Sequence, residues 1–123
     1  MGYYTTYELS TKGNKYKISD IVSYMSEEYR SDSYSYNAFA YDFENNINDN
    51  FISDFELYGE RCKWYEHDED MIKLSLQFPE TVFCLYGEGE ESGDLWYKYY
   101  KNGKKQICEA KITFDEYDES QLV

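Results

Sequence analysis

Two alternating stretches separated by Asn102-Gly103 constrain the fold of this 123-residue chain more than any other feature. Asn-Gly as a two-residue connection favours a turn whose twist matches that of two antiparallel strands. Polar and aromatic residues alternate before it in DLWYKYY, and polar and apolar residues alternate after it in KQICEAKITF. The second strand has an expected core face of Cys108, Ala110, Ile112 and Phe114 and an expected solvent face of Glu109, Lys111 and Thr113.

Three further strands and two helices are predicted before this hairpin. β-Branched and aromatic runs predict strands at 3–9, at 56–64 and within TVFCLY. Apolar residues at helical spacing predict a helix over 19–30 with Ser19 as its cap. A second helix is predicted to begin at a cap on Asp68 and to end before Pro79, because proline cannot continue a helix.

The resulting order, β-α-β-α-β-β-β, predicts an α+β domain with two helices packed on one face of an antiparallel sheet, of ferredoxin-like character. We find no domain boundary, so residues 1–123 are expected to form a single domain. Within it, 31–50 is expected to be an irregular insertion, because Ser, Asn and Asp favour turns. Residues 115–123 are expected to be an acidic tail.

The net charge of −13, from 25 acidic and 12 basic residues, argues against binding to nucleic acids or anionic membranes. It favours a basic partner, a cation or a merely solubilising coat. The three cysteines form no close pair, which indicates reduced thiols in a cytosol. No apolar run reaches membrane-spanning length and no signal peptide is visible, so a cytoplasmic location is expected.

The stretch GEGEESGDLW, residues 87–96, has the glycine content of a phosphate-binding loop. Such a loop precedes a helix and carries a basic residue, whereas this one precedes a strand and carries glutamates. We therefore expect no phosphate site, and we expect the glycines to permit a left-handed backbone in a wide hairpin connection. The loop presents clustered carboxylates instead.

Metal binding and catalysis have weak support. Oxygen ligands alternate at Asp42, Glu44, Asn46 and Asn48 as in a calcium loop, but the glycine of such a loop is missing. His67 is the single histidine, and we expect it to be a solvated residue at a helix start and not a catalytic base. The chain is accordingly predicted to have no metal, no cofactor and no enzymatic activity.

Charge is unevenly distributed along the chain. Acidic residues dominate 31–60 and 64–97, whereas lysines gather at 12–17 and 98–105. Carboxylates along strands and a helix start can approximate the phosphate array of DNA and compete for a basic groove. The residues expected to contact a partner are Tyr65, Glu66, Asp68, Glu69, Asp70, Glu88, Glu90, Glu91, Asp94 and Trp96, provided that the helix start and the acidic loop lie on neighbouring edges.

The block from Lys63 to Gln106 resembles a recurrent pattern in small uncharacterised proteins of phages and bacterial mobile elements. The segments that carry the resemblance are KWYEHDEDM, FPETVF, GEGEESGDLW and YKNGK. It implies a ferredoxin-like α+β domain in a phage or prophage and supplies no catalytic residue. By analogy, small acidic phage proteins include anti-CRISPR and anti-restriction inhibitors, some of which mimic DNA.

Three hypotheses follow. The first is a phage-encoded, anti-CRISPR-like inhibitor that binds a basic nucleic-acid-binding host protein, a CRISPR effector nuclease above all, through an acidic surface. The alternative is a non-catalytic interaction module whose charge only solubilises it. A small hydrolase or metal-dependent enzyme would require a concave pocket at His67 or at 42–48.

Overall fold

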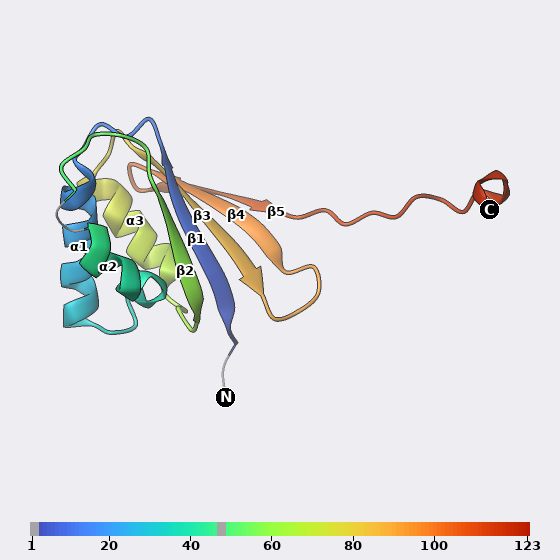
Figure 1. The fold of residues 1–123 in the computed structure, drawn as a ribbon, viewed down its shortest axis with the longest axis horizontal. Coiled ribbons are helices and arrows are strands. Elements are labelled where there is room, and N and C mark those ends of the chain that lie inside the picture. Colours follow the sequence, from blue (N-terminus) through green and yellow to red (C-terminus); the bar gives the residue numbers. More distant parts are fainter. Residues whose placement is uncertain (1–2, 47–48) are drawn as a thin grey trace.

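The structure, a computed structural model, describes residues 3–46 and 49–123. One five-stranded sheet carries its helices on a single face and leaves the other face uncovered (Figure 1). The predicted α+β class is therefore confirmed.

The strands are β1 (Thr5–Lys12), β2 (Glu56–Cys62), β3 (Val82–Gly89), β4 (Leu95–Lys101) and β5 (Lys104–Glu109). They lie in the order β2-β1-β3-β4-β5, and all neighbours are antiparallel. Because β2 and β3 both run opposite to β1, they are parallel to each other, and the helix between them makes a split β-α-β unit. The whole order of elements differs from the β-α-β-β-α-β of a ferredoxin-like domain, so that finer assignment is not confirmed.

The two predicted helices are present as α1 (Ile18–Ser31) and α3 (His67–Gln77). Their predicted caps are wrong. Ser19 lies inside α1, which begins after Lys17, and the backbone carbonyls of Asp49 and Phe51 accept the first free N–H groups. Asp68 lies in the first turn of α3, which begins after Glu66. A capping side chain is dispensable where carbonyls from another segment satisfy the helix end.

The expected irregular insertion contains helix. A short 3₁₀ helix, η1 (Asn37–Phe39), runs into α2 (Ala40–Asn46); η1 lies beside β2, and α2 packs against α1. Tyr36 enters this segment with a left-handed backbone, φ 57°, and is buried with Phe39 and Phe43. The aromatic side chains of this segment therefore belong to the core, and their burial stabilises a helix that its polar residues do not favour.

The core is strongly aromatic. The indole of Trp64 is at its centre, with ring centroids of Tyr7 and Tyr36 each 5.3 Å away and that of Phe39 6.1 Å away. The predicted apolar stripes of both helices are buried, including Ile21, Val22, Met25, Met71 and Leu74. These contacts attach the helices to the sheet.

The glycines of GEGEESGDLW serve different purposes. Only Gly93 has a left-handed backbone, with φ 85°. Gly87 lies within β3, where a Cβ would overlap the indole of Trp96, and at Gly89 a Cβ would overlap the carboxylate of Asp94. Two of the three glycines thus make room for neighbouring side chains and are not turn residues.

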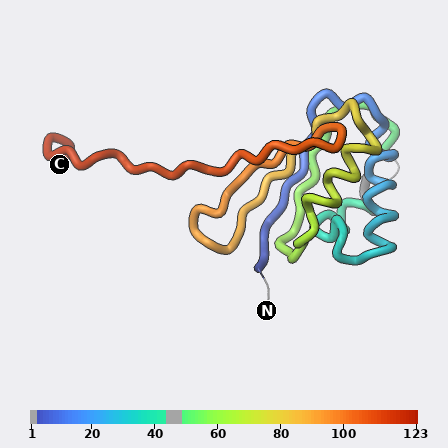
Figure 2. Tube along the Cα trace, turned by 180° about the vertical axis from the view of Figure 1, so that it is seen from behind, coloured from blue at the N-terminus to red at the C-terminus, as the bar shows by residue number. Residues whose placement is uncertain are grey.

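The last predicted strand ends early. β5 stops at Glu109, and from Ala110 to Asp118 the chain runs extended, without turn or bend, away from the rest of the protein (Figures 1 and 2). Ile112 and Phe114, expected in the core, are 58% and 90% exposed. The assigned faces are also wrong, because Ile107 is paired with Lys98 on the helix side while Cys108 lies on the open side. A final 3₁₀ turn, η2 (Glu119–Gln121), ends the tail.

Candidate functional site

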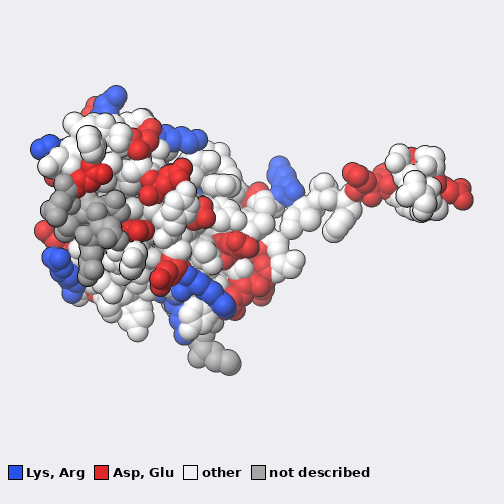
Figure 3. All heavy atoms as spheres, viewed as in Figure 1, with Lys and Arg blue, Asp and Glu red and all other residues white. Residues whose placement is uncertain are grey.

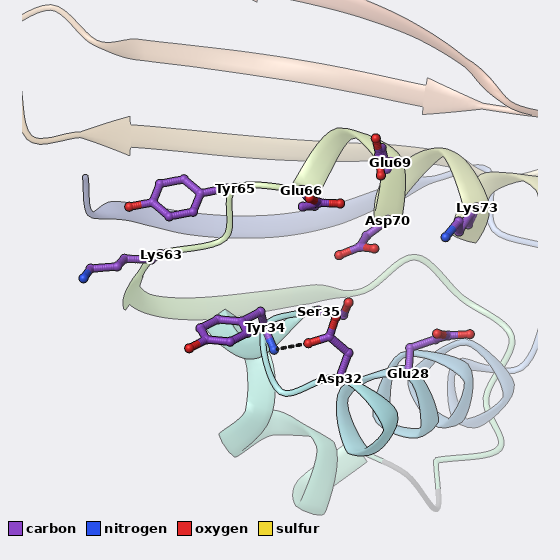
Figure 4. A pocket seen from close by; sticks show the side chains of 10 residues that line it. All are labelled: Glu28, Asp32, Tyr34, Ser35, Lys63, Tyr65, Glu66, Glu69, Asp70 and Lys73. Atoms are coloured by element: carbon purple, nitrogen blue, oxygen red, sulfur yellow. Dashed lines mark hydrogen bonds between the residues drawn. The ribbon is translucent and has the colours of Figure 1, made fainter. Parts of the chain in front are cut away.

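A groove of about 600 Å³ lies at the end of the molecule where α1 ends and α3 begins (Figure 4). One wall comes from the last turn of α1 and the turn after it, and the other comes from the link between β2 and α3 and the first turns of α3. The lining residues are Glu28, Asp32, Tyr34, Ser35, Lys63, Tyr65, Glu66, Glu69, Asp70 and Lys73. We call this set the acidic groove.

Local hydrogen bonds fix the α1 wall. Asp32 follows α1, and its backbone N–H donates to the carbonyl of Glu28 at 2.9 Å. The carboxylate of Asp32 accepts the backbone N–H of Tyr34 at 3.0 Å, which holds the turn (Figure 4). Two residues later the buried hydroxyl of Tyr36 donates to the carbonyl of Asp70 on α3 at 2.6 Å. That bond ties the two walls together.

The acidic groove combines five carboxylates, two lysines and two exposed tyrosines. Tyr34 and Tyr65 are 70% and 65% exposed, so their rings are free to cover an incoming group. Glu69 lies beside Glu66, and the hydrogen bond and repulsion between the two raise the pKa of Glu66. A cationic side chain placed between these carboxylates would relieve that repulsion.

Asp70 has a structural role as well. Its carboxylate accepts the indole N–H of the buried Trp64 at 2.7 Å while it also lines the groove. The indole thereby positions this carboxylate from the core side. The sequence placed Tyr65, Glu66, Glu69 and Asp70 in a partner-binding surface, and the structure brings these four together in one groove.

The acidic loop between β3 and β4 lies at the same end of the molecule. The hydroxyl of Tyr3 donates to the carboxylate of Asp94 at 2.5 Å, and its backbone N–H donates to the hydroxyl of Tyr65 at 3.0 Å. One residue thus contacts both the loop and the groove wall. The helix start and the loop are neighbours, as the sequence-based hypothesis required.

Two carboxylates of the loop make hydrogen bonds or ion pairs within the protein. Glu90 pairs with Arg61 at 2.9 Å and accepts the backbone N–H of Tyr4, which together lower the pKa of Glu90. Asp94 holds Tyr3. Among the described residues, the side chains of Glu88 and Glu91 make no hydrogen bond or ion pair, so these two are available to a partner. In the view of Figure 3, acidic side chains gather at this loop with basic ones beside them.

Asp68 and Trp96 are not in the groove. The carboxylate of Asp68 accepts the hydroxyl of Tyr100 at 2.5 Å and pairs with Lys105 at 3.1 Å and Lys98 at 3.4 Å. Burial raises the pKa of Asp68, but these hydrogen bonds and cations outweigh burial and lower it to about 2. The carboxylate joins α3 to β4 and β5 and thus has a structural role; its contact with a partner stays a prediction.

His67 is packed into the fold and is not a solvated residue. Its ring stacks on the indole of Trp96 with centroids 5.2 Å apart and planes 10° apart. Nδ1 is 3.0 Å from the carbonyl of Trp64, and Nε2 is 2.8 Å from the ammonium of Lys98. Since a carbonyl accepts and an ammonium donates, the ring is the neutral Nδ1–H tautomer. Burial and the charge of Lys98 lower the pKa of His67.

All three cysteines are free; Cys84 is buried, and Cys62 and Cys108 are half-buried. Burial raises the pKa of Cys62 to about 11, which suppresses its thiolate. The expectation of reduced thiols agrees with this geometry.

Metal ligands do not converge in the part of the chain that the structure describes: no group of three or more His, Cys, Asp or Glu side chains is placed to hold an ion. Of the calcium-like pattern, Asn48 and the side chains of Glu44 and Asn46 lie outside the described residues. Asp42 lies in α2 and accepts a hydrogen bond from the backbone of Tyr58. Within residues 3–46 and 49–123, no helix has the length and apolar character needed to cross a membrane.

No protein-family model, no curated protein and no solved structure matches this chain. The resemblance to phage and mobile-element proteins stays a prediction. The groove itself is the strongest indication of what the molecule binds.

Sequence reasoning missed half of the groove. Glu28, Asp32 and Tyr34 come from the end of α1 and the turn after it, whereas the other wall begins only at Lys63. The available signal was the segment SDSYSY, in which an aspartate and two tyrosines follow the predicted helix. Helical spacing also places Glu69 and Lys73 on one face of α3.

Proposed function

We propose that this protein is a non-catalytic binder of a basic, nucleic-acid-binding protein and that the acidic groove receives lysine or arginine side chains of that partner. The observation that carries the proposal is the convergence of five carboxylates and two exposed tyrosines from separate segments on one groove. Carboxylates attract a cationic side chain, and tyrosine rings hold it by cation–π contact.

Such a binder would act as an inhibitor. A basic channel that normally holds phosphates presents the same cations to a carboxylate surface, and a ligand of high negative charge is steered toward it. With the net charge of −13, this supports the hypothesis of a phage-encoded inhibitor of bacterial defence, with a CRISPR effector nuclease as the first partner to test. The ferredoxin-like relationship belongs to the same proposal, supported by the split β-α-β unit around β1.

A second candidate rests on the uncovered sheet face. Tyr58 on β2, Tyr86 on β3 and Tyr97 and Tyr99 on β4 lie there, and the rings of Tyr86 and Tyr97 have centroids 5.0 Å apart. Tyrosine-rich surfaces often supply the main contacts of an interface. This face supports the alternative of an interaction module whose acidity only solubilises it.

The test is capture of a partner by two variants with equal net charge. Glu66→Lys/Glu69→Lys reverses the groove, and Glu88→Lys/Glu91→Lys reverses the two available carboxylates of the loop. We expect the groove variant to lose binding by roughly tenfold or more and the loop variant to lose less, because each reversal removes an attraction of about 0.2–1 kcal/mol and adds a repulsion of similar size. The measurement is titration against purified CRISPR effector nucleases, with target-DNA cleavage as the second readout.

Three outcomes separate the hypotheses. Loss of binding and of inhibition only in the groove variant supports the proposal, and binding that falls as salt rises supports its electrostatic basis. Equal binding by both variants and the wild type would exclude the groove. A partner that is lost instead when Tyr97 is replaced by serine would favour the interaction module on the sheet face.

A further inference from the structure

We propose that the edge of β5 and the tail that follows it form a two-fold interface between two copies of this chain, with residues 104–116 of each copy paired antiparallel about Ala110. The tail leaves the body directly from the edge strand, extended and with its apolar side chains exposed (Figure 2). It therefore continues an unpaired strand edge with a second strand-like segment.

The two edges of the sheet are not equivalent. η1 lies beside β2, and the side-chain amide of Asn37 donates to the carbonyl of Lys63 just past that strand. β5 is paired with β4 on one side only, and none of the described strands or helices runs along its other side. An open edge presents alternate backbone N–H and C=O groups that a second strand can pair with.

The hairpin determines which residues of β5 direct their backbone N–H and C=O groups to the open edge. In the two-residue connection, Lys101 and Lys104 form the closing pair, and further along Ala110 donates its N–H to the carbonyl of Leu95 at 2.9 Å. Even-numbered residues from 104 to 110 thus direct their backbone groups to β4. Odd-numbered residues direct theirs to the open side.

A two-fold partner must therefore match odd residues with odd residues. Centring the axis on Ala110 places Glu109 opposite Lys111 of the second copy and Lys105 opposite its Asp115, each pair occurring twice. On the even positions, Lys104 comes opposite Glu116. Opposite charges that face each other across an antiparallel pair stabilise it, and like charges destabilise it.

Other registers that also match odd residues with odd residues pair the charges less favourably. An axis through Glu109 places two glutamates in contact, and an axis through Lys111 places two lysines in contact. A two-fold axis through Ile107 pairs Lys105 with Glu109. The paired region then ends near Lys111, so Ile112 and Phe114 stay exposed to water. Only the register about Ala110 satisfies all the charges from 104 to 116 and gives both apolar residues a strand to lie on.

The same register explains the exposed apolar side chains. Ile112 of one copy comes opposite Cys108 of the other, and Phe114 comes opposite Gln106, on the open face beside the strand that carries Tyr97 and Tyr99. The two open faces would then form one continuous surface. Lysines on an edge also protect monomers from pairing, but this protection does not require the matching acids Asp115 and Glu116 further along the tail.

The first experiment is sedimentation equilibrium of the full chain and two charge variants. We expect a dimer for the wild type, a dissociation constant at least about tenfold larger for Lys111→Glu, and recovery to within a few-fold for Glu109→Lys/Lys111→Glu, since the swap restores both pairs. Both residues are exposed, so circular dichroism should show an unchanged fold. A wild type that is monomeric at its highest soluble concentration, or a swap that fails to restore the dimer, overturns the proposal.

The second experiment identifies the register. In a Cys108→Ser background, Ala110→Cys places two thiols at a facing position about 4.5 Å apart at Cα, within reach of a disulfide. We expect this variant to form a covalent dimer on mild oxidation, mapped by peptide mass spectrometry. Ile107→Cys in the same background is the matched control, because its copies face Thr113 in the proposed register. Cross-linking at 107 and not at 110 overturns the register about Ala110.

Discussion

At the scale of single residues, neighbouring polar side chains of this protein have different surroundings. Glu66 and Glu69 face the groove, whereas the adjacent Asp68 is held by Tyr100 and Lys105. The sequence HDED does not distinguish these roles, because every member is polar and close to a helix start. Only the direction from the helix axis separates them, since residues three apart share a face.

His67 makes stability depend on pH. Its pKa in the folded protein lies below its ordinary value of 6.5, so the folded protein resists a proton that the unfolded chain accepts. Its contribution is complete above about pH 6.5 and is lost as the pH falls below that value. We expect the free energy of unfolding, measured in urea, to decrease from pH 7.5 to pH 5.

His67→Gln provides the control for this prediction. Glutamine has no proton to gain in this range, so the variant should show a flatter dependence between pH 7.5 and pH 5. Asp68 has a pKa of about 2, below its ordinary value of 3.8, so its contribution is lost only as the pH falls below 3.8. A wild type and a variant with parallel profiles from pH 7.5 to pH 5 would show that His67 is not the titrating group.

At the scale of elements, helices and strands were predictable where a single physical cause produces the sequence pattern. The stripes of α1 and α3 and the Asn102-Gly103 hairpin were found because burial and turn geometry leave direct marks. η1 and α2 were missed because their helix is stabilised by aromatic burial and not by propensity. The alternation of 105–114 predicted an extended backbone correctly, but alternation does not reveal which partner the strand has.

The candidate site was half predictable for a similar reason. Residues 65–70 carry a dense local charge signal, and the structure places four of them in the groove. Glu28 and Asp32 reach it only through the packing of α1 against the sheet and the buried hydroxyl of Tyr36. Such a contact joins residues 34 positions apart, and no single-sequence spacing rule detects it.

Tyr36→Phe tests the connection between the groove walls. The hydroxyl donates to the carbonyl of Asp70 from a buried position, so its removal should lower the free energy of unfolding by about 1–2 kcal/mol. Tyr34→Phe, two residues earlier, removes an exposed hydroxyl and should change stability by less than about 0.5 kcal/mol. Equal midpoints in urea for both variants would mean that this bond does not hold the walls together.

At the scale of the whole molecule, several lysines lie at the end of the sheet opposite the groove. β1 and β4 both run from the end with the groove and the acidic loop toward the opposite end, as their pairing with β3 shows. Lys12, Lys15 and Lys17 lie in or after β1, and Lys101 and Lys104 flank the hairpin turn, so these bases gather far from the groove. These lysines are therefore too far from the groove to repel the basic partner that we propose for it.

Concentrated negative charge that serves binding should reduce the stability of the free protein. Raising NaCl from about 20 mM to about 500 mM shortens the Debye length from more than 20 Å to under 5 Å and screens this repulsion. We expect the melting temperature to rise by several degrees, even though the same salt weakens binding to a basic partner. The exposed pair of Arg61 and Glu90 opposes this effect only slightly, because surface ion pairs contribute little.

Two double variants, in which glutamine replaces glutamate, test where in the molecule the charge repulsion arises. Glu66→Gln/Glu69→Gln and Glu27→Gln/Glu80→Gln change the net charge equally, and all four residues are exposed. If the groove concentrates the repulsion, the first variant should melt at a higher temperature than the second and respond less to salt, because adjacent carboxylates repel more strongly than separated ones. The same variant should bind a basic partner less well. Equal melting temperatures and equal salt responses would instead mean that the net charge as a whole destabilises the protein. The carboxylates of the groove would then contribute no more to this destabilisation than other acidic residues.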